Sequence, residues 1–253
     1  MKSLKVLPLA IIGTVVGLLI AGFMIVTATL PVQASAQASG VDNLYFYTLG
    51  FSGIIFAIVL LFLLVAIYRF RAHPGDHRDG LNLHGITWLE ILWTAIPFVI
   101  VLTCAFAGWL VLNNDNVKGA ALKDGEVIHV TAYQFGWKFS YQGHGVRENP
   151  DLVVPVDTPI LFDLTTMDVM HAFWVPAWRV QMGATPAQVN QTTVTPTRIG
   201  EYELVCAYLC GAGHTQMNSA VEGGLVKKVR VVSRADFDAW LAEQKAAAQK
   251  ANA

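Results

Sequence analysis

The chain has 253 residues, of which 54% are hydrophobic and only 14% are charged, so it is not an ordinary soluble globular protein. Its formal net charge of −1 argues against nucleic acid as a partner, because nucleic-acid-binding proteins usually carry a basic excess. The apolar excess lies in three runs within the first 112 residues, and the remainder is long enough for one domain of modest size.

The first apolar run, residues 7–30, follows Lys2 and Lys5. Two small-x-small patterns come after it, at residues 34–36 and 36–38. A basic start, an apolar stretch and an Ala-x-Ala site are typical of a secretory signal peptide. The run is long for a signal, so an uncleaved membrane anchor is the alternative. We expect residues 1–38 to be a signal peptide cut near Ala36 or Ala38, or otherwise an anchor.

The second and third runs, at about residues 44–68 and 88–112, each reach the length of about 20 residues that crosses a bilayer. The short loop between them carries Arg69, Arg71 and Arg78. By the positive-inside rule, this loop lies in the cytoplasm. We therefore predict a transmembrane hairpin over residues 39–112 and an extracytoplasmic domain after it.

Residues 113–233 contain short segments rich in Val, Thr, Tyr and Phe, separated by Gly, Pro, Asp and Asn. Segments of this kind are typical of an antiparallel β-sandwich or small barrel, here with seven or more strands. Residues 234–253 are rich in Ala and Lys and predict a helix that frays into a tail. The predicted fold class is therefore an α+β membrane protein.

The most informative stretch is VCAYLCGAGHTQM, residues 205–217, with Cys206, Cys210, His214 and Met217. A disulfide would explain the two cysteines in an extracytoplasmic domain but not the histidine and methionine. A c-type haem needs C-x-x-C-H, which the stretch lacks. Zinc has little use for a thioether, and a blue copper site has no place for a second thiolate.

A pair of copper ions does have a place for a second thiolate, since two thiolates can each bridge both metals. Thiolate, thioether and imidazole ligands also suit copper. Each copper then needs one terminal imidazole, so a second histidine is required. His171, in the segment DVMHAFWVP, is the candidate. A lone histidine there is more often a hydrogen-bonded structural residue, but the motif in the same domain favours a ligand.

These segments, with QFGWKF and HGITWLEILWTAIP, give a sequence that resembles subunit II of the haem–copper cytochrome c oxidases. The resemblance implies a Greek-key, cupredoxin-like β domain carried by a two-helix membrane hairpin. It implies a binuclear copper A (CuA) centre with two copper ions. The implied ligands are the bridging Cys206 and Cys210, the imidazoles of His171 and His214, the thioether of Met217 and the backbone carbonyl of Tyr208.

The resemblance also implies a function and partners. The CuA centre of the family accepts electrons from cytochrome c, or from a c-type haem domain, and passes them to subunit I. The haems and CuB of the complex belong to subunit I, where oxygen is reduced and protons are translocated. The resemblance therefore implies a multi-pass protein of a bacterial plasma membrane, assembled with subunit I and the other oxidase subunits.

Four further residues are candidates, three through the resemblance or its departures and Asp168 through its position. Phe135 stands where the family usually has the tryptophan through which electrons arrive, and Trp137 follows two residues later. Glu90 matches an acid at the mouth of a proton pathway, although a carboxylate at the level of the lipid headgroups is the alternative. Asp168, three residues before His171, could orient the metal site or simply be exposed.

Other departures concern magnesium and the electron donor. Tyr208 and Gly183 stand where the family usually has acids, and a phenol is a poor magnesium ligand, which counts against a magnesium site shared with subunit I. Residues 113–233 contain nine Lys and Arg against eleven Asp and Glu, too little charge for strong steering. Apolar docking is the expectation, with about half of the following side chains packed in the core instead: Met167, Phe173, Trp174, Trp178 and Tyr208.

The main alternative with the same copper chemistry is a CuA-bearing subunit of a nitric oxide reductase. A quinol oxidase subunit is disfavoured because that branch lacks the copper ligands, and nitrous oxide reductase has a much longer chain with a propeller. A membrane-tethered copper carrier or a disulfide-stapled binding module would not require the full ligand set together with Glu90 and the hairpin.

Overall fold

The computed structural model describes the chain except for residues 1–5, 28–29, 72–73, 76–84, 115–122 and 252–253. Two units form within it, one of residues 1–30 and 42–112 and the other of residues 31–41 and 113–253. The predicted loop residue Arg78 lies outside the described residues.

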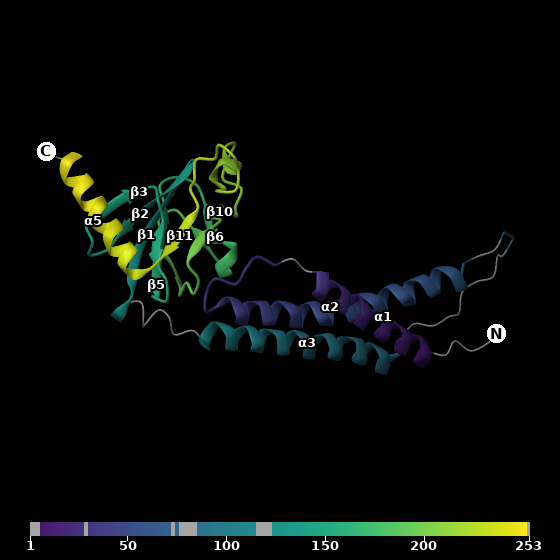
Figure 1. Ribbon diagram of the computed structural model, residues 1–253. Coiled ribbons are helices and arrows are strands. Elements are labelled where there is room, and N and C mark those ends of the chain that lie inside the picture. Colours follow the sequence, from purple (N-terminus) through teal and green to yellow (C-terminus); the bar gives the residue numbers. More distant parts are fainter. Residues whose placement is uncertain (1–5, 28–29, 72–73, 76–84, 115–122, 252–253) are drawn as a thin grey trace. The chain divides into compact units, whose positions relative to one another are not determined.

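The first unit is helical, with α1 over Val6–Thr27, α2 over Ala38–Arg69 and α3 over Thr87–Asn114 (Figure 1). By length and composition, α2 and α3 are the two described helices that could each cross a membrane. Their many exposed apolar side chains, such as Leu63, Phe98 and Trp109, suit lipid or an apolar partner. The two predicted spans are therefore present, and α1 coincides with the first apolar run.

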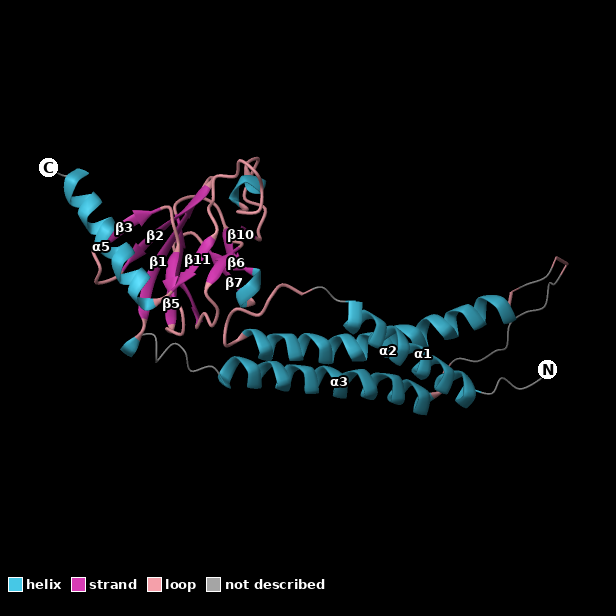
Figure 2. Ribbon diagram, viewed as in Figure 1, coloured by secondary structure: helices cyan, strands magenta, loops and turns pink. Residues whose placement is uncertain are grey.

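The second unit is a β domain with eleven described strands and two short 3₁₀ helices (Figure 2). The strands are β1 (Glu126–Tyr133), β2 (Gly136–Tyr141), β3 (Val146–Asn149), β4 (Val153–Pro155), β5 (Ile160–Thr166), β6 (His171–Val175), β7 (Val180–Ala184), β8 (Asn190–Val194), β9 (Gly200–Tyr202), β10 (Val205–Cys206) and β11 (Val229–Val232). The 3₁₀ helices are η1 (Pro176–Trp178) and η2 (His214–Met217). They lie in the connections that follow β6 and β10.

The strands form three sheets, with the orders β3-β2-β1-β5-β8, β10-β6-β7 and β4-β11-β9. The prediction of a purely antiparallel domain is wrong in detail, because β1 pairs with β5 and β4 pairs with β11 in parallel. Alternating apolar side chains look the same in both kinds of pairing, so the sequence pattern cannot distinguish them. The sandwich architecture itself agrees with the prediction.

Alternation along the strands builds the core. In β1, the side chains of Ile128, Val130 and Ala132 are fully buried, and in β5 those of Ile160, Phe162 and Leu164 are. Apolar residues two apart point to the same face of a strand, so both strands bury one face against the other sheets. This core supports the strands that carry the metal-binding motif.

Helix α5, over Arg234–Ala251, follows β11 and lies beside β3 and β4 (Figure 1). Its residues Phe237, Trp240 and Leu241 are buried at helical spacing, and the Trp240 ring lies 5.1 Å from that of Tyr141. The predicted C-terminal helix is therefore present and closes one side of the core.

Candidate metal centre

Strand pairing brings two distant segments of the motif together. In the antiparallel pair of β6 and β10, Cys206 lies opposite Phe173, and the amide of Ala207 donates to the carbonyl of Ala172 at 3.0 Å. His171, at the start of β6, therefore lies beside the end of β10. The chain then turns back, so that His214 and Met217 begin and end η2, which lies against β10.

Six potential ligand groups converge at this point. The Sγ atom of Cys206 lies 3.8 Å from Nδ1 of His171 and 3.3 Å from the carbonyl oxygen of Tyr208. The Sγ atom of Cys210 lies 3.4 Å from Nδ1 of His214 and 3.5 Å from Sδ of Met217. The structure thus brings together every residue that the sequence analysis assigned to the metal.

The two cysteines are free thiols, with their sulfur atoms 3.9 Å apart. A disulfide requires about 2.05 Å, so the two sulfurs are close neighbours but are not bonded. Such a spacing leaves room for metal ions between two thiolates. The disulfide alternative therefore does not describe this geometry.

Four of the candidate ligand residues are buried, with His171 and Met217 0% exposed and Cys206 and Cys210 3% and 4% exposed, whereas His214 is half-buried. Burial, with a smaller contribution from the neighbouring Cys206, raises the pKa of the Cys210 thiol to about 12. A metal that binds here must displace this proton. Two thiols, two imidazoles and a thioether are soft and intermediate donors, a set that fits copper better than zinc or magnesium.

Asp168 holds one side of the cluster. Its Oδ1 lies 2.9 Å from Nε2 of His171, and its Oδ2 accepts from the amide of Gln134 at 2.7 Å. Partial burial raises the pKa of Asp168, but the hydrogen bonds from His171, Gln134 and Val169 outweigh it, so the pKa lies below its usual value. Since the carboxylate binds the outer ring nitrogen, Nδ1 of His171 is left to face the thiols.

Gln134 is a supporting residue that the sequence analysis missed. Its side-chain amide donates to the carbonyl oxygen of Cys210 at 2.6 Å, while its backbone amide binds Asp168. It therefore joins the two halves of the cluster from the turn between β1 and β2. Only its place beside Phe135 in the QFGWKF segment could have drawn attention to it.

Phe135 and Trp137 differ in their surroundings. Phe135 is half-buried, and a Cβ atom placed on Gly213 would overlap its ring, so the ring lies directly on the loop that carries the ligands. Trp137 is 3% exposed, with its ring centroid 6.0 Å from that of His171. Phe135 is thus the more accessible of these two rings, and Trp137 packs against the histidine.

The apolar residues near the loops divide between core and surface. Phe173 and Trp178 are fully buried and Trp174 is half-buried, whereas Met167 and Tyr208 are exposed. Two exposed neighbours, Met170 at 51% and Leu209 at 85%, were missed by the sequence analysis. Gly183 lies against the Tyr208 ring, so the two positions where the family usually has acids are adjacent but carry no carboxylate.

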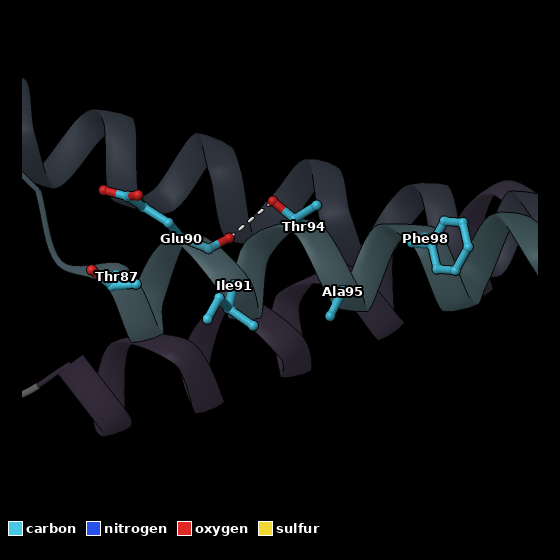
Figure 3. A pocket seen from close by; sticks show the side chains of 6 residues that line it. All are labelled: Thr87, Glu90, Ile91, Thr94, Ala95 and Phe98. Atoms are coloured by element: carbon cyan, nitrogen blue, oxygen red, sulfur yellow. Dashed lines mark hydrogen bonds between the residues drawn. The ribbon is translucent and has the colours of Figure 1, made fainter.

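Glu90 lies elsewhere, in the first turn of α3. With Thr87, Ile91, Thr94, Ala95 and Phe98 it lines a hollow of about 400 Å³ on the helix surface (Figure 3). Its backbone carbonyl accepts from the hydroxyl of Thr94 at 2.9 Å, and its carboxylate lies against Gly85. The side chain is therefore exposed at the start of a membrane-spanning helix.

A membrane hairpin joined to a β domain with a buried Cys, His and Met cluster defines the copper-bearing subunits of haem–copper oxidases. Family models agree: "Cytochrome C oxidase subunit II, transmembrane domain" matches residues 23–110, and "Cytochrome C oxidase subunit II, periplasmic domain" matches residues 127–224. The chain belongs to the cytochrome c oxidase subunit II family. These matches favour the oxidase over the nitric oxide reductase alternative.

Individual relatives cover most of the chain. Cytochrome c oxidase subunit 2 of Saccharomyces cerevisiae is 31% identical over 230 residues, covering 80% of this chain and 84% of the yeast protein. The subunit of Synechocystis sp. is 29% identical over 257 residues, covering 84% of this chain and 75% of the relative. The chain spans about half, 52%, of the longer subunit from Alkalihalophilus pseudofirmus, at 29% identity.

Among solved structures, the periplasmic domain of subunit II of cytochrome oxidase from Bradyrhizobium japonicum is 27% identical. The match covers 47% of this chain and 93% of that domain, with a TM-score of 0.42.

Proposed function

We propose that this subunit II is the electron-accepting subunit of a proton-translocating cytochrome c oxidase. The observation that carries the proposal is the buried cluster of two unbonded thiols, two imidazoles and a thioether. When bound, a pair of copper ions would supply reversible one-electron transfer. Cys206 and Cys210 would hold both ions, with His171 and His214 at the two ends and Met217 and the Tyr208 carbonyl as weaker ligands.

The protein's contribution is rigidity. The ligands lie on paired strands and on a short helix; a hydrogen bond to the Asp168 carboxylate fixes His171, and one from the Gln134 amide fixes Cys210. Ligands that are held in place reorganise little when an electron arrives or leaves, which favours fast transfer. The role in this proposal is transfer alone, since oxygen reduction, haems and CuB would belong to subunit I.

The donor in this proposal is cytochrome c or a c-type haem domain that docks over Phe135. The half-buried ring lies on the ligand loop, and exposed Met170 and Leu209 are apolar. The copper domain would lie on the extracytoplasmic side of a bacterial plasma membrane. The positive-inside rule supports this orientation, because Arg69 ends α2 and Arg71 follows it before α3 begins.

The test is metal analysis of the full-length subunit loaded with copper. We expect two copper ions per chain and an electron paramagnetic resonance spectrum of one unpaired electron shared by two coppers. Cys206→Ser should leave at most one copper, whereas Cys104→Ser, in helix α3 and not among the candidate ligands, should keep both. A single localised copper in the unmodified protein would contradict the proposal.

A further inference from the structure

The segment between α1 and α2 runs along the β domain. Residues 31–41 group with that domain rather than with the helices. The amide of Ala34 donates to the carbonyl of Ala177 at 2.9 Å, and the Ala34 carbonyl accepts from Thr197 at 3.0 Å. The amide of Ala36 donates to the carbonyl of Thr195 at 3.0 Å. We call residues 31–38 the N-terminal strap.

Side-chain contacts, in addition to the backbone hydrogen bonds, hold the strap against the β domain. Ala34 is 0% exposed and is part of the hydrophobic core of the β domain. Ser35 is buried, and its hydroxyl donates to the carbonyl of Trp178 at 2.8 Å while accepting from the amide of Ala38 at 3.2 Å. Ser35 therefore joins the β domain and also caps the first turn of α2.

Further contacts continue at both ends of the strap. The guanidinium of Arg179 donates to the carbonyl of Pro31 at 2.7 Å, and the side chain of Gln37 accepts from the amide of Thr195 at 3.2 Å. Ala36 is exposed between these contacts. The strap thus lies along the edge of the β domain, with an isolated antiparallel bridge between Ser35 and Pro196.

This packing conflicts with a cut at the small-x-small patterns. A chain cut after Ala36 or Ala38 would lose the core position of Ala34. It would also leave the carbonyls of Ala177 and Trp178 and the amide of Thr197 without these partners. Buried backbone groups that lose their hydrogen bonds strongly destabilise a fold.

The strap also lies one element away from the metal cluster. Ala177 and Trp178 belong to η1, which directly follows β6, and β6 begins with His171. Strand β6 in turn pairs with β10, which ends at Cys206. Anchoring η1 therefore holds the far end of the strand that carries one candidate ligand.

We propose that the N-terminal strap is a retained segment of the β domain, and that the mature chain is not cut after Ala36 or Ala38. The segment that looks like a cleavage site is then a structural element. The small side chains of its alternating alanines serve close packing at Ala34 and Ala38, both 0% exposed, rather than recognition by a peptidase.

The intact mass of the subunit, purified from the native membrane complex, tests this directly. We expect a mature chain that begins at or before Pro31. A chain that begins at Gln37 or Ser39 would overturn the proposal. This outcome does not depend on the copper content, so its failure is separate from that of the proposed function.

A matched pair of variants separates packing from processing. Ala36 belongs to both small-x-small patterns but is exposed, so Ala36→Glu abolishes both patterns without entering the core. If the patterns were cleaved, Ala36→Glu would add the mass of the uncleaved segment. We expect only the mass of the substitution, with a thermal midpoint within about 2 °C of the parent.

Ala34→Glu should instead lower the thermal midpoint of the copper-free subunit by about 5 °C or more, because it forces a carboxylate into the core. If this variant does not accumulate, Ser35→Ala is the milder change, expected to lower the midpoint by a few degrees through loss of the bond to Trp178. Parent-like midpoints for both Ser35→Ala and Ala34→Glu would overturn the proposal.

Discussion

Met217 offers a sharp test of the metal cluster because it is fully buried and its Sδ lies 3.5 Å from the Cys210 sulfur. Leucine has a similar volume, so Met217→Leu should lower the free energy of unfolding by under about 1.5 kcal/mol. Met217→Ala leaves a cavity and should cost about 2–5 kcal/mol. At about 3 °C per kcal/mol, these losses correspond to under about 5 °C and about 6–15 °C in thermal midpoint.

The assay combines thermal unfolding of the copper-free subunit with copper content and reduction potential of the loaded subunit. We expect Met217→Leu to keep two coppers per chain but to shift the potential and slow electron transfer, since only a weak thioether ligand is lost. Complete loss of copper from the leucine variant would show that Met217 is an essential ligand. An unchanged potential would show that its sulfur does not contact the metal.

Three further predictions concern the other functional residues. Asp168→Asn should lower copper affinity about 10–100-fold, measured by competition with a chelator, because it weakens the hold on the outer nitrogen of His171. Phe135→Ala should slow stopped-flow reduction by cytochrome c far more than Glu222→Gln, and the rate of the parent should vary only a few-fold between 0.01 and 0.1 M salt. Glu90→Gln should lower oxygen turnover of the whole complex while leaving reduction of the copper site by cytochrome c unchanged.

The helices and strands could be predicted because their signals are local. Long apolar runs indicate membrane helices, and alternating residues indicate half-buried strands. The start of α2 at Ala38, earlier than the apolar run near residue 44, was not predictable from hydropathy. At that start, the Ser35 hydroxyl accepts from the amide of Ala38 and donates to the carbonyl of Trp178 in the β domain, and such long-range contacts leave no local pattern in the sequence.

The metal cluster was predictable for a different reason, namely the chemistry of its side chains. Two thiols, an imidazole and a thioether within one short stretch suit few metals, and His171 completes the set. Gln134 could not be found in this way. Its role consists of two hydrogen bonds to segments far along the chain, and amides form such bonds in almost any surrounding.

The two aromatic residues beside the cluster, Trp137 and Phe135, differ in exposure, one packing against a candidate ligand and the other reaching the surface. Trp137 is buried edge-on to His171, so its packing holds the imidazole orientation that Asp168 also holds. Phe135 is the aromatic side chain of the pair that reaches the surface, and it lies on the loop between Cys210 and His214. Under the proposed function, a domain charge near neutrality would add little steering, so a donor would associate through apolar contact with Phe135, Met170 and Leu209. A donor that suits this surface therefore presents an apolar rim around its exposed haem edge rather than a ring of lysines.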